Sequence, residues 1–277
     1  MKNGGGSDIT SAADSAQFRK VQIVGAPIAV VSLPKVLSVF ENWVANKEDR
    51  FVLLRDVHGA MQARSNEPVR SAQNSADMVL PDGVPFVWAV RGLGVKSITR
   101  VCGIDLLPAA CRFGVDKNWR HYFYGASPGV ADQLSRAFRE VDPNIEIVGT
   151  YCPPFRALSK EEDEAICEQI RAAKPDFVWV SLSTPKQDLW MHDHMGKLGG
   201  VTMVGVGGAF EINAGIVPRA PMWMQRSGLE WAFRLAQEPN RLWKRYFKSL
   251  PLFVVLTLYQ IGSSWIGGAR VAEGKLK

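Results

Sequence analysis

Two loops of this sequence hold side chains that are suited to acid–base or anion-binding chemistry. The apolar run 76–80 leads into Pro81, Asp82 and Gly83, and a carboxylate at a strand end can act as a general base or bind a sugar hydroxyl. Arg100, a few residues before a predicted helix, can pair with a diphosphate. Ordinary structural roles compete with both, because Asp-Gly before a helix is also N-cap chemistry and most arginines are simply solvated.

A third candidate loop follows the apolar run 121–125. Tyr124, Gly125 and Ser127 come just before a predicted helix, and small residues there allow backbone N–H groups to approach a phosphate. The helix dipole favours an anion at the same place. The loop lacks the G-x-G-x-x-G pattern, and a glycine at a strand–helix junction also serves close packing. A phosphate site and a purely structural turn therefore both stay open.

Two more strand ends carry polar or small residues. After the run 176–180 come hydroxyl, ammonium and amide side chains, a set that suits a nucleotide or a sugar, although a helix cap with an early proline explains the same pattern. After the run 201–206 come two glycines, which permit the close approach of a ligand or of a helix. The candidate residues of these two loops are Pro185, Gln187, Gly207, Gly208 and Glu211.

Metal-binding patterns are weak in this sequence. His192 and His194 are two residues apart on a predicted helix, which points the rings in different directions, so both are expected on the surface. No DxD triplet, Walker A sequence, GxSxG or HExxH motif occurs. We therefore expect no metal and no cofactor. The cysteines lack zinc-ribbon spacing and are expected to be reduced thiols: Cys102, Cys111, Cys152 and Cys167.

The elements that must position these loops belong to the α/β class. Short β-rich runs alternate with longer amphipathic stretches, which indicates a Rossmann-like, largely parallel sheet with helices on both faces. The clearest helix is 159–173, which opens with a capping box of Ser159 and Glu162. Helices are also expected over 33–46 and 128–140. The expected strands are 21–25, 50–54, 76–80, 121–125, 145–149, 176–180 and 201–206.

Charge is spread unevenly along the 277 residues. Residues 219–277 hold ten Lys and Arg against three Glu and so carry +7, whereas the rest of the chain carries −1. Such asymmetry indicates an anionic partner for the C-terminal part. We expect a disordered arm over 1–18, an α/β domain over 19–218 and a basic, aromatic-rich helical appendage over 219–277.

The appendage combines cations and aromatic rings with an apolar stretch. Helices are predicted over 221–237 and 240–248 with a break at Pro239, and residues 249–269 form an uncharged segment of 21 residues. That segment could span a membrane, lie at its interface or dock on the protein. An anionic membrane fits better than nucleic acid, whose grooves need no uncharged stretch. The cations expected at the membrane or the acceptor are Arg219, Arg226, Arg234, Arg241, Lys244, Arg245 and Lys248.

Taken in chain order, these segments resemble one family of bacterial enzymes. They read ADMVLPDGVPFVW, RVCGIDLL, YFYGASPGVADQL, VGTYCPPFR, WVSLSTPKQDLWM, GVGGAFEINAG and APMWMQRSGLEWAFRLAQEPNRLWKRY. Over residues 22–250 the chain is similar to the WecG/TagA/CpsF glycosyltransferases, glycosyltransferase family 26. The resemblance implies an α/β catalytic domain with a helical C-terminal appendage. It also implies transfer of a hexose from a UDP-sugar to an undecaprenyl-diphosphate-linked saccharide, for exopolysaccharide or other cell-surface glycans.

Matching motifs carry the family's roles onto individual residues. Asp82 of the PDG motif becomes the general base of an inverting displacement, and Arg100 of the R-V-x-G block becomes a catalytic cation. Gln187 of the P-K-Q block becomes a substrate ligand. Glu211 stands where the family has Asp, and Asp188 stands where it has Glu, so the charge is kept at both positions.

One block departs from the family pattern. The family usually reads T-x-N-x-H where this sequence has Leu54, Asp56 and His58. Leucine removes a hydroxyl contact, and Asp56 could alter sugar selection or add a second carboxylate. The resemblance implies a substrate-binding set of Asp56, His58, Gly83, Tyr124, Gly125, Ser127, Pro185, Gln187, Gly207, Gly208 and Glu211.

Two other classes of function remain open. A non-catalytic module would bind a UDP-sugar or a membrane without turnover. A nicotinamide-dependent oxidoreductase would need G-x-G-x-x-G followed by an acidic residue, which no predicted strand supplies.

The resemblance also implies partners and a location. The partners are a UDP-sugar donor, a polyprenyl-diphosphate-linked acceptor and an anionic membrane surface, with a homo-oligomer left open and no nucleic acid. The protein is expected as a peripheral protein on the cytoplasmic face of the bacterial inner membrane. The family uses N-acetylmannosamine, its uronic acid or glucose, and the VHG, PPFR and EPNRLWKRY segments favour a neutral hexose or a uronic acid.

Overall fold

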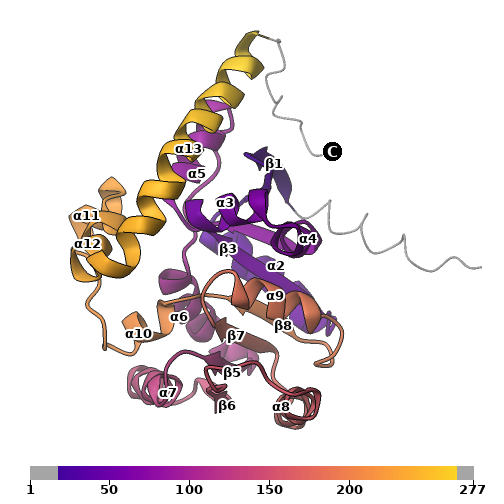
Figure 1. Cartoon of the computed structure of the whole chain (residues 1–277). Coiled ribbons are helices and arrows are strands. Elements are labelled where there is room, and N and C mark those ends of the chain that lie inside the picture. Colours follow the sequence, from indigo (N-terminus) through magenta and orange to yellow (C-terminus); the bar gives the residue numbers. More distant parts are fainter. Residues whose placement is uncertain (1–17, 267–277) are drawn as a thin grey trace, which may run out of the picture.

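The computed structural model describes residues 18–266, which contain one eight-stranded sheet (Figure 1). The strand order is β1-β2-β4-β3-β8-β7-β5-β6. β1 and β2 pair antiparallel, and the other neighbouring strands described run parallel. The predicted α/β class and largely parallel sheet are confirmed. The strands are β1 (Arg19–Ile23), β2 (Ala26–Val30), β3 (Arg50–Arg55), β4 (Met78–Pro81), β5 (Arg120–Gly125), β6 (Glu146–Tyr151), β7 (Phe177–Ser181) and β8 (Thr202–Gly205).

The central strands are apolar on both sides because helices cover both faces of the sheet. Along β3, Val52 and Leu54 belong to one buried hydrophobic cluster, whereas Phe51 and Leu53 belong to the other. This alternation is the two-residue period of a strand, which turns successive side chains to opposite faces. The continuous apolar runs of the sequence therefore mark the middle of a covered sheet.

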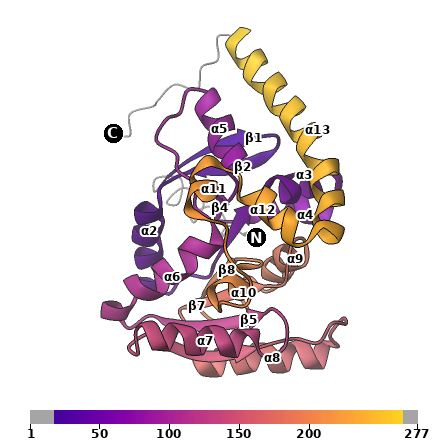
Figure 2. The same cartoon turned by 90° about the vertical axis from the view of Figure 1, so that its left-hand side faces the viewer.

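Each face of the sheet carries its own set of helices (Figures 1 and 2). The first cluster takes residues from α2, α6, α7 and α10, and the second takes residues from α3, α5, α8 and α9. The predicted capping box of α8 is confirmed, since Ser159 and Glu162 each accept a hydrogen bond from the other's backbone N–H. These helices are α2 (Leu33–Ala45), α3 (Val57–Ser65), α4 (Glu67–Ser75), α5 (Val84–Gly92), α6 (Gly103–Phe113), α7 (Val130–Val141), α8 (Lys160–Ala173), α9 (Lys186–Asp193) and α10 (Ala209–Asn213), with a short 3-10 turn at Val115–Lys117.

The first hairpin was only half predicted. Residues 21–25 were expected as one strand, but the chain reverses at Val24 and Gly25, where φ is 50° and 84°, and β2 returns beside β1. Glycine adopts such positive φ values without steric cost. Apolar residues continue from Val24 to Val31, so the turn left no polar break in the sequence.

The described part of the appendage is helical, with no strand after Pro218. The prediction of a single helix over 221–237 is wrong, because Gly228, with φ of 76°, ends a first helix. The predicted break before Pro239 is confirmed. The three helices are α11 (Met222–Ser227), α12 (Glu230–Gln237) and α13 (Pro239–Ile266).

Helix α13 joins two segments that were predicted apart. The basic stretch and the apolar stretch form one helix that continues through Pro251. Figure 1 shows α13 running along the side of the α/β domain and past its end. The predicted arm, apart from the buried Phe18, and residues 267–277 lie outside the described residues.

Candidate active site

A cleft of about 1270 Å³ lies at the carboxyl ends of the parallel strands. The loops after β3, β4, β5, β7 and β8 line it, together with residues of α12 and α13. Ligands of open parallel sheets bind at this edge. Pockets for one small ligand measure about 300–1000 Å³, so this cleft has room for two substrates. The predicted site residues that line it are Asp56, His58, Asp82, Gly83, Arg100, Tyr124, Ser127, Gln187, Gly207, Gly208, Glu211 and Arg234.

Asp82 lies half-buried in the cleft, directly after β4. Burial raises the pKa of its carboxyl group to about 6, against the opposing pull of Arg100, and the neighbouring Asp56 adds to the rise. The N-cap of α5 is Gly83, so the alternative role of Asp82 as a helix cap is wrong. A carboxylate with this pKa is ionised at neutral pH and is a stronger base than an ordinary aspartate.

Arg100 stands beside Asp82 and is held from two sides. Its Nε donates to the backbone carbonyl of Asp82 at 2.7 Å, and its guanidinium pairs with a Glu230 carboxylate oxygen at 2.6 Å. Glu230 is buried and belongs to α12, so the appendage fixes an arginine of the α/β domain. Charge-assisted bonds of this kind hold a guanidinium in one orientation. The arrangement presents a fixed positive charge to the cleft.

The predicted appendage cations fall into different environments. Arg219 pairs with Asp105 at 2.6 Å and with Glu230 at 3.5 Å, so it ties the appendage to α6. Arg234 reaches into the cleft, because its guanidinium lies 2.9 Å from the place that a Cβ on Gly208 would take. The side chains of Arg226, Lys244 and Lys248 are exposed, and those of Arg241 and Arg245 lie outside the described residues.

Residues 54–58, which differ from the family's T-x-N-x-H pattern, have structural roles. Asp56 is the N-cap of α3 and accepts a hydrogen bond from the Gly59 N–H at 2.7 Å. Asparagine and aspartate are about equally good caps, so the exchange of Asn for Asp preserves this turn. Leu54 is buried in the core beside the cleft. A hydrogen bond of 3.2 Å joins His58 Nδ1 to Ser249 Oγ of α13.

The P-K-Q-D segment at the start of α9 holds neighbouring parts of the cleft in place. Gln187 is buried, and its Oε1 accepts a hydrogen bond from the Gly207 N–H at 3.1 Å, which fixes the loop after β8. Asp188 pairs with Arg55 at 2.7 Å, and both side chains are 1% exposed. This buried pair joins α9 to the end of β3, next to the Asp56 cap.

Removing the Asp188 charge is expected to destabilise the fold strongly. Asp188→Ala leaves the Arg55 guanidinium buried without its counter-charge, which typically costs about 3–5 kcal/mol. Urea unfolding followed by circular dichroism measures the change. Glu67→Ala is the matched control, because the Arg70–Glu67 pair is exposed and such pairs contribute about 0–1 kcal/mol. Equal stability losses in the two variants would contradict the assignment.

The predicted phosphate loop is partly structural. Gly125 does not line the cleft, and a Cβ on it would lie 2.5 Å from the Ser181 carbonyl oxygen, so glycine is needed there for strand packing. Tyr124 is buried and stacks on Trp190 with ring centroids 4.3 Å apart. Ser127 is exposed and lines the cleft. Pro185 follows a cis peptide bond and also lies outside the lining.

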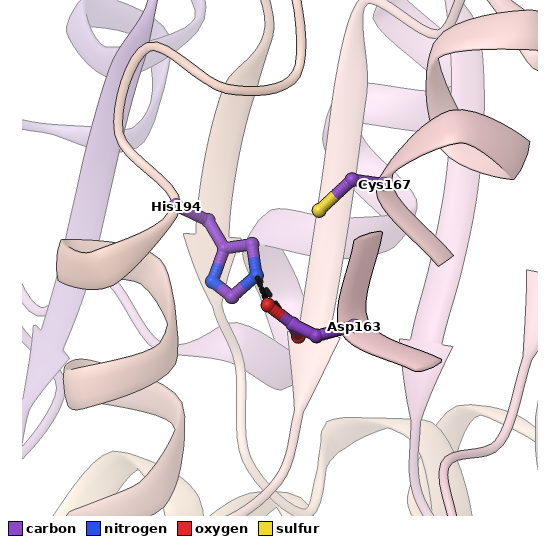
Figure 3. Close-up of side chains that lie close together, drawn as sticks. All are labelled: Asp163, Cys167 and His194. Carbon is purple, nitrogen blue, oxygen red and sulfur yellow. Dashed lines mark hydrogen bonds and ion pairs between the residues drawn. The ribbon is translucent and has the colours of Figure 1, made fainter. Parts of the chain in front are cut away.

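The expectation of two surface histidines is wrong for His194. Its side chain is buried and contacts Asp163 of α8 at 3.1 Å (Figure 3). Sequence spacing missed this contact because it compares only neighbours along the chain, whereas Asp163 belongs to α8 and His194 follows the end of α9. Cys167, one turn after Asp163 on the same helix, lies in the same group.

Two further cleft residues escaped sequence reasoning. Glu230 stands in the first turn of α12, where an acidic residue is common for the helix dipole alone. Trp190 appears as one of several apolar residues of α9, and only the fold shows that its ring lies against Tyr124 in the cleft. The GLEW and QDLW segments that contain them were the available signals.

The cleft thus brings the Asp82 carboxylate together with Arg100 and Arg234 at the carboxyl edge of a parallel sheet, a set that suits the binding of phosphorylated substrates. The model of the Glycosyl transferase WecG/TagA/CpsF family matches residues 21–265. The chain therefore belongs to this family of glycosyltransferases, as the sequence segments predicted.

Curated relatives agree with this assignment. The chain is 32% identical over 75% of its length, and 78% of the relative's, to the N-acetylglucosaminyldiphosphoundecaprenol N-acetyl-beta-D-mannosaminyltransferase of Bacillus spizizenii. It is 25% identical over 85% of its length, and 91% of the relative's, to the enzyme of the same name from Staphylococcus aureus.

Proposed function

We propose that this protein transfers a hexose or N-acetylhexosamine from a UDP-sugar to a saccharide on undecaprenyl diphosphate, with inversion at the anomeric carbon. The observation that carries the proposal is Asp82, a carboxyl group with a pKa of about 6 beside Arg100 in a cleft with room for two substrates. The relatives' names support the lipid-linked acceptor and N-acetylmannosamine as the transferred sugar.

The chemistry divides between the base and the cations. Asp82 takes the proton of the acceptor hydroxyl as its oxygen attacks the anomeric carbon from the face opposite UDP. The bond between that carbon and the donor phosphate oxygen breaks, and the electron pair stays on UDP. Arg100 and Arg234 supply positive charge where this charge develops. Because Glu230 and the carbonyl of Asp82 hold Arg100 in place, its charge needs no rearrangement during the reaction.

Helix α13 supports a peripheral position at the membrane, which we propose is at its cytoplasmic face. By length and composition, Leu242–Ile266 could cross a bilayer. One side of the helix is nevertheless docked: Phe253 is buried, and Gln260 bonds the β1–β2 hairpin through Gln22 and Val24. A spanning helix would have to leave these contacts, so we place α13 at the interface. Its outward side exposes Trp243, Phe247, Leu252, Val254, Val255, Leu258, Tyr259, Trp265 and Ile266.

A panel of substrates tests the proposed function. UDP-N-acetylmannosamine, its uronic acid, UDP-glucose and UDP-N-acetylglucosamine are each incubated with a prenyl-diphosphate-linked monosaccharide, and products are read by mass spectrometry. We expect one donor to be consumed with formation of a disaccharide. Calorimetry with UDP and NAD accompanies the assay. Binding of a UDP-sugar without product would indicate a non-catalytic module, and binding of NAD alone would indicate an oxidoreductase.

Transfer is expected to proceed without added magnesium or manganese. The sequence lacks a DxD triplet, and Arg100 and Arg234, which both line the cleft, are the cations that we propose for the charge of the departing UDP. Initial rates in excess EDTA should therefore equal rates with either metal added. Activity that disappears with the chelator and returns only with magnesium or manganese would show that a hard cation performs this task.

A further inference from the structure

Three side chains with metal-binding atoms meet at the wall of the cleft, away from the Asp82 loop in the sequence (Figure 3). Asp163 and Cys167 lie one turn apart on the same face of α8, and His194 caps the end of α9. Their ligand atoms lie within 4.8 Å of one another. Cys167 and His194 are buried, while Asp163 is half-buried and lines the cleft with His194. None of the three has a role in the proposed transfer.

The hydrogen bonds of His194 leave one ring nitrogen facing a carboxylate. Nδ1 lies 2.7 Å from the carbonyl oxygen of Trp190, which can only accept, so Nδ1 carries a hydrogen. In the neutral ring Nε2 then holds a lone pair, yet it lies 3.1 Å and 3.2 Å from the two carboxylate oxygens of Asp163. Two acceptors at this distance repel each other. A cation held between Nε2 and the carboxylate would replace this repulsion by two favourable contacts.

We propose that Asp163, Cys167 and His194 bind a thiophilic divalent cation of the zinc class. Imidazole, thiolate and carboxylate are the ligands that zinc takes in proteins, and a histidine that ligates metal through one nitrogen commonly donates the other N–H to a backbone carbonyl. Cys167 also belongs to the hydrophobic cluster on this face of the sheet, so the cobalt titration below separates a metal ligand from a core cysteine.

The spacing of the three groups agrees with a tetrahedral site. Metal–ligand lengths of about 2.0–2.3 Å place neighbouring ligand atoms roughly 3.3–3.8 Å apart. The distances between Asp163 and His194 are already 3.1 Å and 3.2 Å. The sulfur lies within 4.8 Å of both other ligand atoms, so it has to move closer by about 1 Å to complete a tetrahedral site. Water fills the fourth position, as in metal sites with three protein ligands.

Binding has a defined chemical balance and a structural consequence. The Cys167 thiol loses its proton to solvent as the metal–sulfur bond forms, and His194 binds through the lone pair of Nε2 with no change in its own protons. The metal then links α8 to the end of α9, two elements of the cleft wall that are otherwise joined here by the Asp163–His194 contact. A cation that binds the folded chain and not the unfolded chain raises the melting temperature.

Cobalt(II) is the first probe, because it takes zinc sites and is coloured. The full chain is freed of metal with a chelator and titrated with cobalt. We expect saturation at one equivalent and a thiolate-to-cobalt charge-transfer band, followed by loss of the band when zinc is added. Isothermal calorimetry in two buffers of different ionisation enthalpy should report one proton released per zinc bound. An Asp163–His194 contact without a metal site predicts neither the band nor stoichiometric binding, and that result would overturn the proposal.

Matched variants locate the site. Cys167→Ser is expected to abolish the charge-transfer band, and His194→Gln is expected to weaken zinc binding by 10-fold or more. Cys152→Ser and His192→Gln are the controls, since Cys152 bonds the Ala126 carbonyl instead and His192 lies outside the group. Both controls should bind cobalt like the wild type. A band that survives in Cys167→Ser, or disappears in Cys152→Ser, would overturn the assignment.

A second readout separates this metal from the transfer reaction. Zinc should raise the melting temperature of the wild type and of Cys152→Ser, and should not raise that of Cys167→Ser. UDP binding by the metal-free chain, well below its melting temperature, should be unchanged. Because the donor set contains a thiolate, magnesium and manganese should not compete. An equal rise in all three proteins would assign the effect to a different zinc site and contradict the proposal.

Discussion

Asp82→Asn is expected to lower the transfer rate by ~10²–10⁴, the usual effect of losing a general base. The amide keeps the size of the carboxyl group and can still bond to an acceptor hydroxyl, but it cannot take the proton. Burial raises the pKa of Asp82 to about 6, so kcat/KM of the wild type should fall as pH drops below about 6. The limb of the pH profile on the acidic side should be absent from the residual activity of the variant.

The stability of the same variant separates chemistry from folding. Folding raises the pKa of this carboxyl group, which means that the folded state disfavours its ionised form. The free energy of unfolding should therefore decrease as the pH rises from 3.8, the ordinary pKa of the group, to about 6, its pKa in the folded protein. Asparagine carries no such charge. Asp82→Asn should therefore be at least as stable as the wild type at pH 7 by urea unfolding. Near-normal turnover in this folded variant would show that Asp82 is not the base.

Much of the fold could be predicted because the local signals agree with the tertiary structure. The central positions of β3, β7 and β8 are apolar, as expected for strands with helices on both faces of the sheet. The capping box marked the start of α8. The hairpin between β1 and β2 was missed because apolar residues continue through it. The division of 221–237 depended on Gly228, which is tolerated within helices as well as after them.

The candidate site was predicted where one residue follows one strand, and missed where two distant segments meet. Asp82 and Gln187 are readable from strand ends and matching motifs, and both line the cleft. The ion pair between Glu230 and Arg100 joins residues that are 130 positions apart in the sequence, so no local pattern predicts it. Asp163 and His194 belong to the same class of contact. Gly125 shows the opposite error, since a glycine needed for packing resembles one needed for a phosphate.

Charges introduced on the outward side of α13 are expected to release the enzyme from membranes. Phe247 and Leu258 are 72% and 64% exposed, whereas Phe253 on the opposite side is 2% exposed and packs on Phe86 of α5. Phe247→Glu/Leu258→Glu should therefore abolish binding to anionic vesicles, and transfer to a full-length undecaprenyl acceptor in vesicles should become nearly undetectable. Flotation assays and product formation measure the two effects. Val141→Glu, at a residue 68% exposed on α7, is the matched control and should leave both unchanged.

Substrates that need no membrane show whether the loss of transfer in the double variant comes from lost membrane binding or from a damaged active site. UDP binding by calorimetry and transfer to a water-soluble, short-prenyl acceptor should stay near wild-type levels in the double variant, because neither residue lines the cleft. Deletion of residues 240–277 should also release the protein from vesicles. Because the deletion removes the buried Leu242, it perturbs the protein more than the double variant does, and UDP binding by the truncated chain is the more demanding test. Lys244 and Lys248 are exposed on the same helix and each contributes ~1 kcal/mol towards an anionic surface. High salt should therefore weaken the binding of the wild type to vesicles without abolishing it, because the contacts of the apolar side chains of α13 do not depend on charge. Equal vesicle binding by the wild type and the double variant would show that the membrane contact lies elsewhere.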